Sequence, residues 1–193
     1  MRSPSPLLAI GMIAVAAPAF GQESNGGIGD VAVAGSVAPV CILGEPSQTV
    51  LDLGLLIETA GARVGRLDDV GDRSVVLPGS FCNFAGSIAT IEASGLVEAS
   101  GNGTAIANGF SRVVNYAASA STWGGNAATT TTSGAADGSG ATTTGTSAVQ
   151  PLPRITDIVV DLGDWTVPGD ALLVAGNYSG VVRITLGPAA IVQ

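Results

Sequence analysis

The chain has 193 residues, a formal net charge of −8 and seven basic residues, all of them arginine, with no histidine. Without His or Lys it cannot perform Ser-His-Asp or Cys-His catalysis, build a His-bearing zinc site, form a lysine Schiff base or use a P-loop lysine. Because its negative charge would repel nucleic acid, we expect no catalytic residue, no cofactor and no nucleic-acid partner.

The composition predicts an all-β protein with one main domain. Hydrophobic residues make up 46% of the chain but aromatic residues only 4%, so the core must be built from Val, Ile, Leu and Ala. Abundant Gly, Thr, Ser and Val favour short strands joined by turns over helices. The length suits a single domain after processing.

Residues 1–21 have the pattern of a secretory signal peptide. Arg2 precedes the apolar run 7–17, and small residues follow it. The run is too short to cross a bilayer. We expect cleavage after Gly21, or alternatively after Ala19, and export to the periplasm and then the cell surface, without a transmembrane segment.

The mature chain would begin with an extension, residues 22–40, that contains a candidate strand. Residues 22–29 are polar and Gly-rich, and residues 30–41 are predicted to form a β-strand. Successive strand residues point to opposite faces, so one face would carry a set of valines with a glycine between them. That set is Val31, Val33, Gly35 and Val37.

Two cysteines, Cys41 and Cys82, are the only ones in the chain. An exported protein with an even number of cysteines is expected to pair them. The Cys41–Cys82 disulfide would stabilise the domain by about 4 kcal/mol and would join the first strand to a strand starting at Cys82. A redox-active pair would need Cys-x-x-Cys spacing, which is absent.

Residues 41–193 are predicted to form the sandwich domain. A short strand is expected at 49–53 and a surface loop at 57–72. In that loop Asp68, Asp69 and Asp72 lack the spacing of an EF-hand and have arginines beside them, so we interpret them as a solvated acidic turn and predict no metal site.

The second half of the chain alternates between strands and a low-complexity stretch. Strands are expected at 110–122 and 155–162, the latter with Ile158, Val160 and Leu162 inward. Residues 123–150 are almost wholly Gly, Ala, Thr and Ser and are predicted to form a flexible loop or hairpin. The last strand would present one face, Tyr178, Gly180, Val182, Ile184 and Leu186.

The order of these motifs resembles that of the pilin subunits of chaperone-usher fimbriae, including the spore-coat-U-like secreted pilins. The matching features are the extension before Cys41, the Val-x-Val-x-Gly-x-Val alternation at 31–37, Thr49 to Gly54, Cys82, and Ala175 to Val182 with its following strand. Each motif is weak alone, so the resemblance lies in their order and spacing.

The resemblance implies an immunoglobulin-like β-sandwich that lacks one strand. The N-terminal extension of the next subunit would fill the resulting hydrophobic groove, with Val31, Val33 and Val37 in pockets and Gly35 between them. The last strand, from Tyr178 to Leu186, would border the groove and bind a periplasmic chaperone. Like subunits and an outer-membrane usher would be further partners.

Two alternatives remain open at the level of sequence. The strand from Asp30 could pair within its own domain and give a self-complete sandwich that does not polymerise. Such a module could instead act as a secreted adhesin that binds a carbohydrate or another surface receptor through Trp123, Tyr116 and the 123–150 loop.

Overall fold

The structure is a computed structural model that describes residues 29–100, 105–121 and 126–188. The predicted signal peptide, Trp123 and the last five residues lie outside the described residues. The chain divides into two units, Met1–Ser36 and Val37–Gln193, and each is described by itself.

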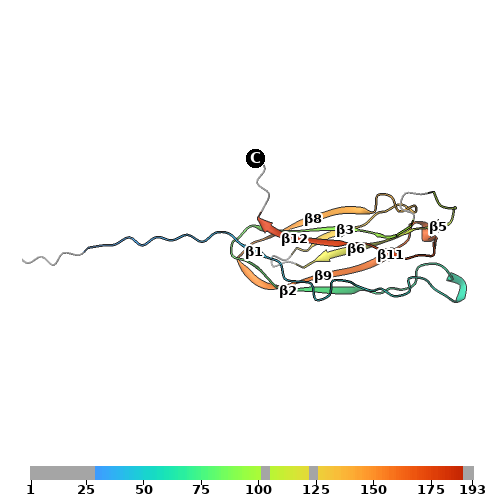
Figure 1. Ribbon diagram of the computed structural model, residues 1–193, viewed down its shortest axis with the longest axis horizontal. Helices are drawn as coiled ribbons and strands as arrows, with labels where there is room; N and C mark the ends of the chain where they lie inside the picture. Colours follow the sequence, from blue (N-terminus) through green and yellow to red (C-terminus); the bar gives the residue numbers. More distant parts are fainter. Residues whose placement is uncertain (1–28, 101–104, 122–125, 189–193) are drawn as a thin grey trace, which may run out of the picture. The chain divides into compact units, whose positions relative to one another are not determined.

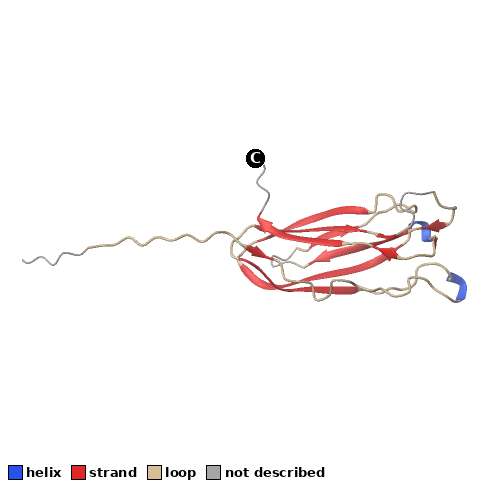
Figure 2. Ribbon diagram, viewed as in Figure 1, coloured by secondary structure: helices blue, strands red, loops and turns tan. Residues whose placement is uncertain are grey.

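The second unit is an all-β sandwich, which confirms the predicted fold class (Figures 1 and 2). The larger sheet has the order β1 (Cys41–Ile42), β2 (Arg73–Cys82), β9 (Arg154–Thr166), β6 (Val113–Ala120), β4 (Leu96–Glu98) and β11 (Tyr178–Ser179), with β7 (Ala128–Thr131) also paired to β6. The smaller sheet has the order β12 (Val182–Pro188), β3 (Ser87–Ser94) and β8 (Thr142–Gln150). The remaining elements are the parallel pair β5 (Phe110–Ser111) and β10 (Leu172–Leu173) and the short 3-10 helices η1 (Gly61–Arg63) and η2 (Pro168–Asp170).

The core lies between the two sheets and is aliphatic, as the composition predicts. Ile158, Val160 and Leu162 of β9 are buried, which confirms their predicted inward face, and they share a cluster with Ile91 of β3. This cluster includes an aromatic contact, because the Tyr116 ring lies 5.0 Å from that of Trp165.

The predicted flexible loop or hairpin at 123–150 is wrong where β7 and β8 lie inside it, because these strands pair with β6 and β3 and not with each other. Alternate residues are buried along β7 and its continuation, including Ala128, Thr130 and Thr132. The composition indicated that too little apolar surface was available, but β-branched threonine suits a pleated surface and the small side chains let the two sheets approach.

Two predicted strands are not strands in the structure. Within the predicted strand 30–41 only Cys41 belongs to one, and residues 49–53 belong to none. The side-chain alternation is present in both, but a strand also needs a backbone partner, and neither segment has one along its length.

Two other predicted strands have different bounds in the structure. Cys82 ends β2 instead of starting the next strand, and a turn with Gly86 at φ +81° leads into β3. The predicted continuous strand from Tyr178 to Leu186 is divided, because β11 pairs with β4 in one sheet and β12 pairs with β3 in the other. The chain changes sheets at Gly180, where an added Cβ would lie 2.7 Å from the Ser94 carbonyl oxygen.

Candidate functional site: an open apolar groove

A long groove with a volume of ≈ 1080 Å³ opens on the sandwich domain. One rim is formed by residues between Leu43 and Ile57, which connect β1 to η1, and the other by the run from Leu173 to Ile184, which includes β11 and the start of β12. The residues that line the groove extend from Leu43, next to β1, to Leu173 of β10, which pairs with β5. β1 and β5 lie at opposite ends of the sandwich (Figure 1).

The floor of the groove is the core of the sandwich. It is formed by side chains that β2, β4, β6 and β9 of the larger sheet supply: Val75, Leu77, Leu96, Tyr116, Val160, Leu162 and Trp165. Among the described residues that line the groove, only Asp52 and Arg183 carry a charge. Removing apolar surface from water is favourable, so a groove with this lining favours an apolar occupant.

The two rims are not joined to each other by backbone pairing. β12 has β3 as its partner on one side, and within the described ranges its other edge pairs with no strand. On the opposite rim Ser47 N–H donates to the Val76 carbonyl at 2.7 Å, but residues 48–55 make no such bond to the far rim. Val50 and Leu55 there are 78% and 67% exposed. An unpaired edge and exposed apolar side chains thus face the same opening.

The rim from Val174 to Tyr178 is held firmly from beneath. The Tyr178 hydroxyl donates to the Val174 carbonyl at 2.7 Å, and Ala99 N–H donates to the Asn177 carbonyl at 3.0 Å. Gly176 packs on the Glu98 side chain, and a Cβ there would lie 2.5 Å from Glu98 Cγ. These contacts fix the rim, so this side of the groove is preformed.

The carboxylate of Glu98 is the charged centre of this support. It accepts hydrogen bonds from the Ser100 hydroxyl and backbone N–H, and it pairs with Arg112 Nη1 at 3.0 Å. The bonds from Ser100, followed by the charge of Arg112, lower the pKa of Glu98. Glu98 therefore stays ionised at neutral pH despite its buried position.

The residues predicted to form the groove edge lie where the groove is. Tyr178, Gly180, Val182 and Ile184 line it, and Leu186 packs on the core beyond it. Within β12, Val182, Ile184 and Leu186 are half-buried, while Arg183 and Thr185 between them are exposed. The alternation predicted for this face is present, although Tyr178 belongs to a different sheet.

The valines of the extension are exposed. In the first unit, described from Gly29, Val31 and Val33 are 86% and 93% exposed, and in the second unit Val37 is 88% exposed. Gly35 has no atom near enough to contact an added Cβ. Burying each of these three valine side chains would contribute roughly 1.5 to 3 kcal/mol of free energy, which the exposed extension does not gain.

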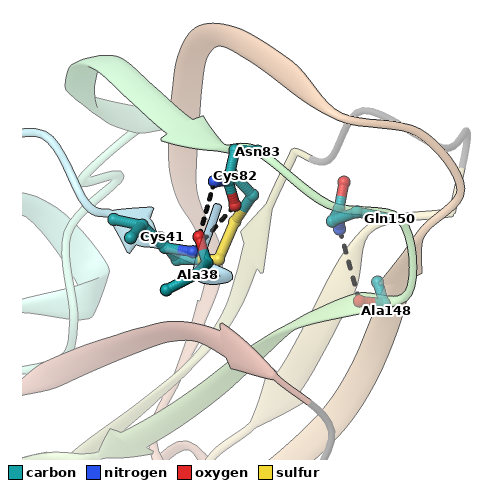
Figure 3. The surroundings of a disulfide bond; sticks show 7 residues. Ala38, Cys41, Cys82, Asn83, Ala148 and Gln150 are labelled. Atoms are coloured by element: carbon teal, nitrogen blue, oxygen red, sulfur yellow. Dashed lines mark hydrogen bonds between the residues drawn. A yellow bond between two sulfur atoms is a disulfide. The ribbon is translucent and has the colours of Figure 1, made fainter. Parts of the chain in front are cut away.

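The disulfide between Cys41 and Cys82 is present, as predicted, and lies beside Asn83 (Figure 3). Cys41 and Cys82 are direct partners in the β1–β2 ladder. The disulfide therefore joins β1 to the end of β2, which corrects the prediction that it would join the first strand to a strand starting at Cys82. The sequence analysis did not identify Asn83, because a single asparagine forms no recognisable motif. The one signal in the sequence is its position next to a paired cysteine.

Two further groups of residues were considered in the sequence: the acidic turn at Asp68 to Asp72, and Tyr116 in the adhesin alternative. Asp68, Asp69 and Asp72 lie with Asp164 around a small hollow, but no group of three or more metal-binding side chains is found among the described residues. Tyr116, predicted as a carbohydrate contact in the adhesin alternative, is only 2% exposed, and its hydroxyl donates to the Ser94 carbonyl at 2.9 Å. Tyr116 is a core residue and cannot stack on a sugar.

Within the described ranges, no helix has the length and apolar character needed to span a membrane. Comparison of the chain with protein-family models, with curated proteins and with solved structures found no match.

Proposed function

We propose that this protein is a structural subunit of a surface filament, in which the extension of one subunit fills the groove of the next as an added strand. The observation that carries the proposal is the open apolar groove along the unpaired edge of β12. Adding a strand there would satisfy backbone groups along that edge and bury alternate side chains in the groove.

The order of the strands supports a sandwich that is one strand short. In an immunoglobulin-like sandwich of constant type, strands A, B, E and D form one sheet and C, F and G the other. Here β1, β2, β9 and β6 lie side by side in that order, and β12 lies beside β3. On this mapping β12 is strand F, and the position next to it, where strand G would lie, is the groove.

The chemistry of the extension supports it as the added strand. Val31, Val33 and Val37 share one face of an extended chain and are exposed. The seven residues 31–37 would span about 23 Å as a strand, which matches the seven residues of β12. Gly35 would lie on the same face between the valines.

The proposed partners and route follow from this assembly. Like subunits would pair through the extension and the groove, and a periplasmic chaperone with an outer-membrane usher would protect and deliver a subunit whose groove is still empty. The disulfide suits an exported protein, and a signal peptide would direct it there. In this assignment the protein is not an enzyme and needs no cofactor.

The proposal is tested with a pair of neighbouring substitutions in the extension. Val33→Asp places a charge on the face that would enter the groove, whereas Ala34→Asp places the same charge on the opposite face. Both residues are exposed, so neither change should affect the fold. We expect the exported native chain and Ala34→Asp to form heat-sensitive ladders on gels, and Val33→Asp to remain monomeric.

Equal ladders from all three chains would rule out insertion of the valine face. A native chain that stays monomeric at high concentration, with or without a chaperone, would contradict the filament itself. Circular dichroism of the three monomers checks that they are equally folded.

A further inference from the structure

The turn that follows β2 makes an unusual set of hydrogen bonds to the chain before β1. Val40 N–H donates to Asn83 Oδ1 at 2.7 Å, and Asn83 Nδ2 donates to the Ala38 carbonyl at 2.9 Å. In addition, Asn83 N–H donates to the Val40 carbonyl at 3.1 Å. Figure 3 shows this cluster of bonds directly beside the disulfide.

The side-chain amide of Asn83 extends the β1–β2 ladder beyond its last backbone pair. Cys41 is opposite Cys82 in that ladder, so Val40 is opposite Asn83. The amide supplies both an acceptor and a donor, which a backbone unit would otherwise supply. Pro39 has no N–H to satisfy and biases Ala38 toward an extended conformation. Residues 38–41 are thus held in line with β1.

This arrangement matters because, on the proposed function, each chain carries both a groove and a segment that fits it. A segment tethered by a short linker has an effective concentration in the millimolar range near its own groove. At micromolar concentrations of subunit, insertion into the chain's own groove would therefore outcompete insertion into a neighbour's. A filament needs something that prevents the first reaction.

Insertion into the chain's own groove would require the chain to reverse between Val37 and Leu43, where the rim begins. Tight reversals take about two to five residues. The residues available are 38–42, and these are held by Asn83, by the disulfide and by the β1–β2 pairing.

We propose that Asn83 is a positioning residue that, together with the Cys41–Cys82 disulfide, blocks reversal at residues 38–42 and so reserves the segment 31–37 for a second copy of this chain. The inference rests on the proposed function. On this inference the Asn83 side chain disfavours insertion of residues 31–37 into the chain's own groove and thereby favours insertion into the groove of a second copy.

The test is hydrogen exchange on dilute monomers of the native chain and of Asn83→Ala, with the disulfide intact. In the native monomer the amides of residues 31–37 should exchange as in an unstructured peptide. In Asn83→Ala the chain can reverse and enter its own groove, so these amides should exchange at least about tenfold more slowly. The thermal midpoint of the monomer should rise, and the yield of ladders should fall.

Two control variants sharpen the result. Asn83→Asp keeps the acceptor for Val40 N–H but loses the donor to Ala38, so its protection should be intermediate. Asn108→Ala changes an exposed asparagine in the turn before β5 and should behave as the native chain does. A role in stability alone would instead lower the thermal midpoint of Asn83→Ala and leave residues 31–37 unprotected, which would overturn the inference.

Protection of residues 31–37 in the dilute native monomer would also overturn it, because the segment would then already occupy its own groove. The proposed function fails in a different way. If the native chain forms no ladders at any concentration while Asn83→Ala still gains protection, the filament is refuted, and with it the reservation of residues 31–37 for a second copy, whereas the block that Asn83 places on self-insertion is supported.

Discussion

At the scale of single residues, a glycine in β8 allows this strand to lie close to β7 within the low-complexity segment. A Cβ at Gly145 in β8 would overlap the Thr129 carbonyl oxygen and lie 2.6 Å from Thr130 Cβ. At Gly187 in β12, by contrast, a Cβ would meet no atom within 4 Å. The two glycines form a matched pair for testing whether this segment is packed or loose.

We expect Gly145→Ala to lower the free energy of unfolding by about 1 to 3 kcal/mol, because backbone atoms of β7 must move. Gly187→Ala should change it by less than about 0.5 kcal/mol. Urea unfolding of both variants measures the difference. Equal stability of the two variants would mean that residues 126–150 are not packed on the sandwich.

Tyr116 gives the domain a defined sensitivity to alkali. Burial raises the pKa of Tyr116 to about 12 from its ordinary value of 10.0. The folded state therefore keeps its proton at a pH where the unfolded chain has lost it. The contribution of protonated Tyr116 to the free energy of unfolding is complete below pH 10. It is lost as the pH rises to 12, and its size is about 2 to 3 kcal/mol.

The chain has no lysine and only two tyrosines, so little else titrates in this range. Burial also raises the pKa of Tyr178 to about 12. Tyr116→Phe should therefore remove only the part of the loss of stability between pH 10 and 12 that is due to Tyr116, whereas Tyr178→Phe should leave that part in place. Thermal midpoints measured across this range, with the ultraviolet absorbance of tyrosinate, distinguish the variants. An identical decline in all three chains would contradict the assignment to Tyr116.

At the scale of elements, the sequence predicts the strands whose pattern is strict and misses those whose pairing depends on distant segments. The alternation of Ile158, Val160 and Leu162 identifies β9 and its inward face. The threonines of β7 and β8 carry no such signal, because their burial depends on how closely the opposite sheet approaches. For the groove, Val182 and Ile184 could be predicted from their face, but not Trp165 or the rim at residues 48–55.

The disulfide is the covalent link between β1 and β2. It closes a loop with a sequence separation of 41 residues, which in the chain-entropy model stabilises the domain by about 4 kcal/mol. The double variant Cys41→Ser, Cys82→Ser should lose stability of this order in urea unfolding. A loss below about 1 kcal/mol would mean that the β1–β2 pairing holds without the covalent link.

At the scale of the whole molecule, charge sets how fast copies of the chain meet. With a net charge of −8, two subunits repel each other across a distance that salt controls. Raising NaCl from about 0.01 M to about 0.15 M shortens the screening length from about 30 Å to about 8 Å. The initial rate of ladder formation should therefore rise several-fold, as measured by size-exclusion chromatography at fixed times.

A rate that is unchanged or lower at the higher salt concentration would show that repulsion does not limit assembly. A neutral solute at the same osmolality serves as the control, because it leaves the charge interactions unscreened.

The groove has a further consequence when it is considered together with the single extension that each chain carries. The two surfaces differ, so a one-way contact between them is heterologous, and in the proposed filament it does not close by reciprocal exchange. Growth by such contacts would be directional, and the two ends of a chain of subunits would be chemically distinct: one would present an empty groove and the other a free extension. A subunit that has the groove but lacks residues 30–37 would act as a terminator, and small amounts of it would shorten every filament it joins.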